Sequence, residues 1–166
     1  MVPDTGLCQM DVIKAYPQLT WDLVWDSDVG SIHVGTAPDA CVLLATAKVD
    51  YYDGPEMQAF CDQLRLFWAS SNRECIHVFD IRSWWYPCSL GALYVLRDLA
   101  ADLKDVWEDR LLFSSLLLGP RMAGPLNFLL GFYTPVRPLR VTSELDEVLT
   151  APPDDSDQDL FAEASD

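Results

Sequence analysis

The sequence predicts a single α/β domain with a mostly parallel sheet of four or five strands and helices packed on it. The chain has 166 residues, of which 50% are hydrophobic and 22% are charged, a size and composition typical of one globular domain. From about residue 40 to residue 150, short apolar runs rich in β-formers alternate with segments of helical period. This alternation indicates a parallel sheet, in which function usually lies at the carboxyl ends of the strands.

Residues 1–30 are an aromatic-rich N-terminal segment. Within it, the stretch TWDLVWD alternates aromatic and aliphatic residues with acids, which is typical of an edge strand or of a loop held by its rings. The runs 31–37 and 40–49 then predict two strands, because a Pro-Asp turn signal separates them.

Two helices follow, with a buried strand at 75–81 between them. Segment 53–71 opens with Gly-Pro and has apolar residues at the spacing of one helix face. That face comprises Met57, Phe60, Cys61, Leu64, Phe67 and Trp68. Segment 89–110 is the longest predicted helix. Its predicted inner stripe is Leu90, Leu93, Leu96, Ala100, Leu103 and Trp107.

The remaining elements complete an α/β domain that spans residues 31–150. After it, residues 151–166 carry six acids and no bases, so they predict a disordered acidic tail. Ser143 and the acids after it predict a capped final helix. The elements expected here are a strand at 111–119, a short apolar helix at 125–133, a strand at 137–143 and the helix at 143–151.

The net charge of the chain indicates which kinds of partner it can bind. The net charge is −15, from 26 acidic and 11 basic residues, which argues against nucleic acid and anionic membranes. No apolar stretch approaches the roughly 20 residues of a membrane span, and the N-terminus lacks the basic start of a signal peptide. We therefore expect a cytoplasmic protein whose partner is a protein that is basic or neutral at the contact. A homodimer is a further candidate assembly.

The cysteines and histidines predict no metal site and no cofactor. The five cysteines include no CxxC pair, and the two histidines have no ligand at metal-binding spacing. Reduced thiols that behave as small core residues are the expected state.

The common enzyme motifs each lack at least one required residue in this sequence. A cysteine phosphatase based on Cys88 would need an arginine where Tyr94 stands, and no GxSxG or GxGxxG motif occurs. The glycine-rich stretch 119–125 lacks the Lys-Ser/Thr pair of a phosphate-binding loop. Asp80 ends a buried strand, where we expect it to hold Arg82 or a loop amide. The sequence thus predicts a protein that is not an enzyme.

The loop after strand 75–81 is the candidate binding site. Three consecutive rings stand there, and they cannot all face inward because successive residues point to different sides. The residues predicted to bind a partner are Arg82, Trp84, Trp85 and Tyr86, since exposed aromatics dominate binding hot spots. The alternative is that the rings pack in the core against the N-terminal segment. Ser89 is a candidate phosphoacceptor or a helix cap.

A strand, a loop and a serine-opened helix with the sequence SLGALYVLRDL resemble the STAS domain of sulfate transporters and anti-sigma-factor antagonists. The later strand LLFSSLLLG, the short apolar helix and the segment RPLRVTSELDEVL match the layout of that family, so the resemblance covers roughly residues 31–150. Ser89 matches the phosphorylatable hydroxyl of the family motif, while Pro87 and Cys88 replace its Asp-Ser. The alternative fold is another small doubly wound one, such as a flavodoxin-like fold.

The resemblance implies a regulatory module that binds a protein through the loop after the central strand. A small-molecule or lipid-binding α/β domain with an apolar pocket is the alternative, because the segment PLNFLLGFY is unusually apolar. If the chain is a regulatory module, a polypeptide should co-purify with it; if it is a ligand-binding domain, a lipid should co-purify.

Overall fold

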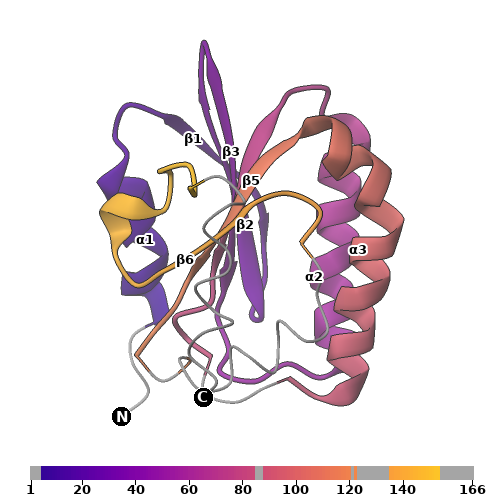
Figure 1. The fold of residues 1–166 in the computed structure, drawn as a ribbon. Helices are drawn as coiled ribbons and strands as arrows, with labels where there is room; N and C mark the ends of the chain where they lie inside the picture. The colour runs from indigo at the N-terminus through magenta and orange to yellow at the C-terminus, as the bar shows by residue number, and fades with distance from the viewer. Residues whose placement is uncertain (1–4, 85–87, 121, 123–134, 154–166) are drawn as a thin grey trace, which may run out of the picture.

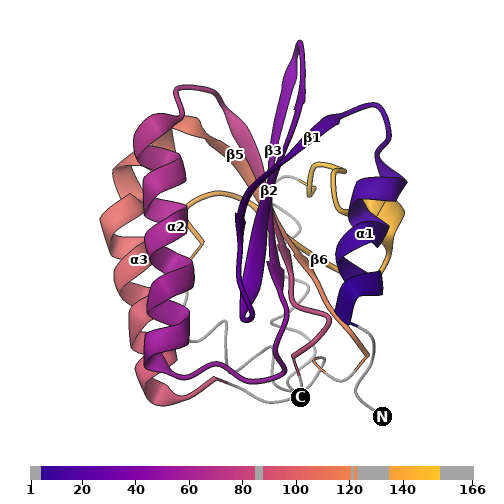
Figure 2. The same cartoon turned by 180° about the vertical axis from the view of Figure 1, so that it is seen from behind.

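The computed structural model describes residues 5–84, 88–120, 122 and 135–153, with residues 5–9 described as backbone only. A six-stranded sheet in the order β1-β2-β3-β4-β5-β6 separates two layers (Figure 1). α2 and α3 cover one face of the sheet, and α1 covers the other together with the segment that follows β6, as the view from behind also shows (Figure 2). The predicted single α/β domain is confirmed, with six strands in place of four or five.

The strands pair in two ways. β1–β2 and β2–β3 are antiparallel, whereas β3–β4, β4–β5 and β5–β6 are parallel. The elements are α1 (Thr5–Ala15), β1 (Thr20–Asp26), β2 (Gly30–Ala37), β3 (Ala40–Ala47), α2 (Gly54–Ser70), β4 (Cys75–Asp80), α3 (Leu90–Arg110), β5 (Leu111–Leu117), β6 (Leu139–Thr142) and the 3-10 helix η1 (Leu145–Glu147).

α2 forms where the sequence predicts it. The Asp53 side chain accepts from the backbone N–H of Glu56 at 3.1 Å, and Glu56 accepts in return from the N–H of Asp53 at 3.3 Å. This capping box, with Pro55 in the first turn, defines the helix start. The buried residues of α2 are Met57, Phe60, Cys61, Leu64 and Trp68.

α3 buries a face slightly different from the predicted one. The predicted Leu93, Leu103 and Trp107 are buried, but Leu90 is 60% exposed. Leu90 is the first residue of the helix and directly follows the capping Ser89. Ala92 and Leu99 complete the buried stripe.

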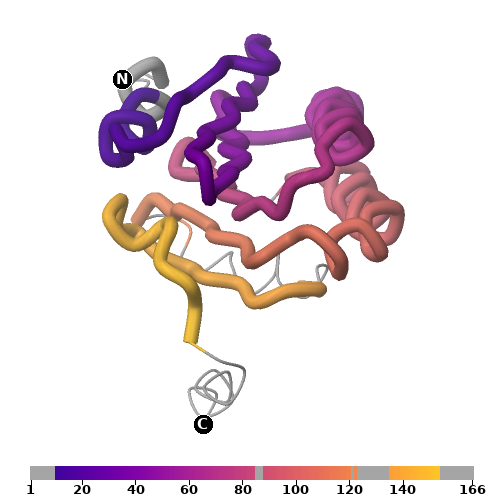
Figure 3. The backbone as a smooth tube through the Cα atoms, turned by 90° about the horizontal axis from the view of Figure 1, so that it is seen from above, coloured from indigo at the N-terminus to yellow at the C-terminus, as the bar shows by residue number. Residues whose placement is uncertain are grey.

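The sheet begins earlier than the predicted domain boundary at residue 31. β1 pairs with β2, and α1 supplies Val12 to a smaller core beneath it. The hydroxyl of Tyr16 donates to the carbonyl of Leu145 at 2.8 Å, which joins the two ends of the described chain. The view from above shows these segments side by side (Figure 3). The N-terminal segment is therefore part of the α/β domain.

The predicted final helix at 143–151 is wrong, because only the 3-10 turn of η1 forms there. The hydroxyl of Tyr16 donates to the carbonyl of Leu145 and accepts from the N–H of Leu149, the two groups that an α-helix would pair with each other. Val148 is buried, and its carbonyl accepts from the hydroxyl of Ser115 on β5. The predicted helix at 125–133 and most of the predicted tail lie outside the described residues. None of the described helices is long and apolar enough to cross a membrane.

Candidate functional site: the carboxyl edge of the parallel strands

The turn after β4 is held by a buried carboxylate. Asp80 is 1% exposed, and its two oxygens accept from the Arg82 guanidinium at 2.9 and 2.7 Å and from the Arg82 backbone N–H at 3.3 Å. Both partners that the sequence suggested for Asp80 are thus present. Arg82 also pairs with Asp11 of α1 at 3.3 Å, so its guanidinium connects the turn to the sheet and to α1.

Two further contacts fix the path of the same turn. The hydroxyl of Ser83 lies 2.9 and 3.0 Å from the carbonyl oxygens of Ala47, the last residue of β3, and Val49, two residues beyond it. A Cβ on Gly119 would lie 2.8 Å from the carbonyl oxygen of Arg82, so the segment after β5 packs tightly on this turn. The turn is therefore positioned by groups from β3, β5 and α1.

The indole of Trp84 points inward from this turn. It is 8% exposed, and its ring centroid lies 5.6 Å from that of Tyr52. Tyr52 in turn packs edge-on against Phe60 and donates its hydroxyl to the carbonyl of Val29. Burial raises the pKa of the Tyr52 phenol, so this hydroxyl stays protonated as a donor.

Ser89 caps α3 at the next position along the edge. Its hydroxyl accepts from the backbone N–H of Ala92 at 3.1 Å, and its own N–H donates to the carbonyl of Tyr52 at 3.1 Å. A Cβ on Gly91 would lie 3.7 Å from the Cα of Gly54. These contacts set the first turns of α2 and α3 side by side, and Figures 1 and 2 show both helices starting at the same end of the sheet.

Apolar side chains are exposed around this cap. Tyr51 and Tyr94 are each 47% exposed and Leu90 is 60% exposed. Leu90 and Tyr94 are four residues apart on α3 and so share one face of the helix, while the Arg97 guanidinium lies 4.9 Å above the Tyr94 ring. We call Tyr51, Ser89, Leu90 and Tyr94 the Ser89 surface.

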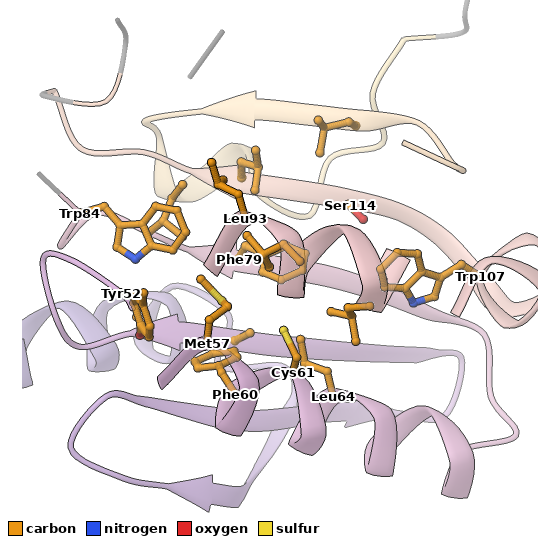
Figure 4. A pocket seen from close by; sticks show the side chains of 17 residues that line it. Tyr52, Met57, Phe60, Cys61, Leu64, Phe79, Trp84, Leu93, Trp107 and Ser114 are labelled. Carbon is orange, nitrogen blue, oxygen red and sulfur yellow. The ribbon is translucent and has the colours of Figure 1, made fainter. Parts of the chain in front are cut away.

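Behind this edge lies an apolar cavity between the sheet and the α2–α3 layer. Its volume is 120 Å³, and side chains from α2, α3 and four strands line it. Figure 4 shows Tyr52 and Trp84 at one end and Trp107 with Ser114 at the other. Apart from Ser114, the residues that line the cavity are aliphatic, aromatic or sulfur-containing. The turn that carries Trp84 therefore belongs to both the surface edge and the cavity wall.

His77 lies in the same layer and is fully buried among rings. Its imidazole contacts Phe79 at 3.9 Å between centroids and faces Trp68 and Trp107 at 6.3 Å each. Burial lowers the pKa of His77 to about 3, so the ring is neutral. Among the described residues, no cluster of three His, Cys, Asp or Glu side chains is arranged to hold a metal ion.

The comparison with solved structures identifies the fold. An uncharacterised protein of the DUF3478 family from Shewanella loihica PV-4, described as having a SpoIIAA-like fold, superposes with a TM-score of 0.55. The match has 14% identity and covers 75% of this chain and 96% of that one. The fold is SpoIIAA-like. This is the fold of STAS domains and anti-sigma-factor antagonists, as the layout of the sequence predicted. No protein-family model matches the sequence, and no curated protein matches it.

On the SpoIIAA-like frame, the residues predicted for the site fall into three groups. Arg82 is held by two carboxylates, and Trp84 lines the cavity, so its burial gives no support to a direct contact with a partner. Trp85 and Tyr86 lie outside the described residues. Ser89 has the geometry of the helix cap, and phosphorylation there stays a prediction.

The exposed members of the Ser89 surface were missed by the sequence analysis. Leu90 was assigned to the inner stripe of the helix, although it immediately follows the capping serine. The exposure of Tyr51 depends on the path of the loop before α2 and has no local signal.

Proposed function

We propose that this chain is a non-enzymatic regulatory module that binds a polypeptide partner through the Ser89 surface. The observation that carries the proposal is the group of three exposed apolar side chains around one capped helix start. Bare apolar surface favours association, and Tyr is enriched at binding hot spots. The carboxyl edge of parallel strands is also where such sheets usually bind.

The charge around this surface suggests the chemistry of the partner. Asp50 and Asp53 flank Tyr51 in sequence, and the chain as a whole carries a net charge of −15. A partner that offers basic or neutral groups around an apolar centre would meet complementary potential here. Asp80, the buried carboxylate at the end of β4, is engaged with Arg82, which supports a structural role for it rather than a catalytic one.

The test compares matched charge insertions at two exposed leucines. Leu90→Glu places a carboxylate in the Ser89 surface, whereas Leu66→Glu does so on α2 at a residue that is 62% exposed. Tagged wild-type chain and both variants are incubated with lysate of the source cells, and captured proteins are quantified by mass spectrometry. We expect wild type and Leu66→Glu to capture a basic or neutral protein. The captured amount of this protein should be about 30-fold lower with Leu90→Glu, as for a hot spot of ~2 kcal/mol.

Equal capture by the two variants would contradict the proposal, provided that their melting temperatures match that of wild type. Sedimentation of the purified chain at several concentrations identifies a second copy as the partner. In that case dimerisation, too, must weaken with Leu90→Glu and persist with Leu66→Glu.

The cavity favours a second candidate function, the binding of a small apolar molecule. A dry cavity of ~150 Å³ is known to accept benzene, so a volume of 120 Å³ suits a molecule of one ring rather than a long lipid chain. Ala45→Val adds methyl groups at the cavity wall. If the cavity binds such ligands, benzene raises the melting temperature of wild type, and this shift disappears in Ala45→Val; no shift in wild type removes the candidate.

We propose a cytoplasmic location for the protein. Four buried cysteines are free thiols among the described residues, which suits a reducing compartment. Thiol labelling of the protein freshly isolated from its cells tests this placement.

A further inference from the structure

Two cysteines meet at the opposite edge of the sheet, where β3 and β4 begin. Cys41 and Cys75 immediately precede the paired residues Val42 and Ile76 of these parallel strands. Their Sγ atoms lie 2.7 Å apart, with Cys75 donating to Cys41. Cys41 is 4% exposed and Cys75 is fully buried. The pair lies far along the sheet from the Ser89 surface, near the β2–β3 hairpin at the top of Figure 1.

The backbone already has the spacing that a disulfide needs. Neighbouring strands lie about 4.8 Å apart, and a disulfide joins Cα atoms separated by about 4.4–6.8 Å. Because the two residues occupy adjacent positions on paired strands, a bond between them requires rotation of side chains and no displacement of either strand.

The surroundings of Cys41 and Cys75 shift the pKa values of the two thiols in opposite directions. The hydrogen bond from Cys75 holds the pKa of Cys41 below its usual value, and the charge of Arg73 adds to this effect. The same bond raises the pKa of Cys75, with burial acting in the same direction. Arg73 is fixed at this end because its guanidinium donates to the carbonyls of Ala37 and Ala40 at 2.8 and 3.1 Å. Cys41 is therefore the better nucleophile of the two.

The other buried cysteines on this face lack such a partner sulfur among the described residues. Burial raises the pKa of Cys61 to about 12 and that of Cys88 to about 11. Thiols of this kind react slowly with oxidants. They serve as matched controls, since all four are buried.

We propose that Cys41 and Cys75 are a redox modification site, at which a peroxide converts the two thiols into a reversible disulfide. The Cys41 thiolate attacks one peroxide oxygen, the O–O bond breaks, and a sulfenic acid and water result. The Cys75 sulfur then attacks the sulfenic sulfur, so that the S–S bond forms, the S–O bond breaks, and the second water leaves with the proton of Cys75. Two electrons pass from the thiols to the peroxide, and a small thiol reverses the reaction by exchange.

The bond closes a ring that runs from β3 through the whole of α2 to β4. It restricts the unfolded chain more than the folded one, so oxidation raises thermal stability. For a ring of this size and a chain of this length, the expected rise in melting temperature is roughly 5–10 °C. This site is independent of the proposed partner binding, and its test uses the purified chain alone.

The test is oxidation by hydrogen peroxide followed by peptide mapping. Trypsin places every cysteine on a separate peptide, with Cys41 on 15–48, Cys75 on 74–82, Cys61 on 49–65 and Cys88 on 83–97. We expect an intact mass lower by about 2 Da, the mass of two hydrogens lost, a cross-link between peptides 15–48 and 74–82, and the rise in melting temperature. Reductant should reverse all three.

Variants assign the roles of the sulfurs. Cys61→Ser and Cys88→Ser should oxidise like wild type, whereas Cys41→Ser and Cys75→Ser should form no bridge. Cys75→Ser should retain a sulfenic acid at Cys41 that dimedone labels, and Cys41→Ser should not label at Cys75. A bridge through another cysteine, or an unchanged thiol count after peroxide treatment of folded wild type, overturns the proposal.

Discussion

The carboxyl and amino ends of β3 and β4 differ in how their loops are held. At the carboxyl end, the buried carboxylate of Asp80 holds Arg82 and the turn that carries Trp84. At the amino end, the exposed Arg73 holds two carbonyls of the β2–β3 hairpin. A buried ion pair is costly to break, whereas an exposed arginine on backbone carbonyls contributes little.

This difference between the two ends indicates which end of the sheet is held more rigidly. The carboxyl end combines a fixed turn, a capped helix and exposed apolar side chains, which is the combination expected of a preorganised binding edge. The amino end combines a thiol pair with a hairpin whose carbonyls are bound by an exposed arginine. The two ends should therefore respond differently to equivalent substitutions.

The largest expected difference concerns the two side chains that hold these loops. Asp80→Ala leaves the Arg82 charge partly buried with one partner fewer, so we expect a loss of about 3 kcal/mol in the free energy of unfolding. Arg73→Ala should cost less than about 1 kcal/mol, because the freed carbonyls can bind water. Urea denaturation of both variants measures the difference. Similar losses would show that the carboxyl end is no more rigidly anchored than the amino end.

A second difference follows from His77, which lies in the middle of β4 between the two ends. Its pKa is lowered to about 3 in the folded chain and is about 6.5 when unfolded, so the unfolded state binds more protons between these values. Stability should therefore fall as the pH drops below 6.5, by about 2 kcal/mol between pH 7 and pH 5 from this residue.

Denaturation at several pH values in that window checks the histidine effect. His77→Phe, which keeps a ring among Trp68, Phe79 and Trp107, should remove most of the pH dependence. His33→Gln should leave most of it, since His33 is only partly buried. If His77→Phe retains the full acid sensitivity, another group is responsible.

A smaller difference in stability is expected between substitutions of two serines at helix ends. Ser89 caps α3 at the carboxyl edge, and Ser71 follows α2 at the amino edge. Ser89→Ala should cost about 1 kcal/mol of stability, while Ser89→Asp should retain the cap because a carboxylate also accepts from the helix N–H groups. Ser71→Ala should change stability by less than about 0.5 kcal/mol. Thermal unfolding that ranks Ser71→Ala as the more damaging change would refute this order.

Local patterns predicted those parts of the fold that depend on neighbours in sequence. The periodicity and capping residues of α2 give its position closely, because both signals act within the helix. The final helix failed because the hydroxyl of Tyr16, which is remote in sequence, contacts both the carbonyl of Leu145 and the N–H of Leu149, the two groups that an α-helix would pair with each other. The sequence carried no clear helix signal for α1, because the packing of this region depends on contacts between Tyr16 and the segment around Leu145.

The candidate site was predicted in place but not in its details. The position of the turn after β4 followed from the alternation of strands and helices, and the roles of Asp80 and Ser89 as anchor and cap followed from their positions at element ends. The inward direction of Trp84 depends on its packing against Tyr52, which is remote in sequence, and the exposure of Leu90 depends on how the first turns of α2 and α3 lie relative to the sheet. The cavity depends on how side chains from two helices and four strands fit together, which no local pattern encodes.

Hydrogen exchange of the chain, alone and with the partner captured by the Ser89 surface, tests the central claim most directly. The proposed binding edge predicts slower exchange on binding in the backbone around Tyr51 and in the first turns of α3. The hairpin at 37–40 and the segment 71–75 at the amino edge should be unaffected. Protection confined to the amino edge, with unchanged exchange around Ser89 and Leu90, would contradict the account.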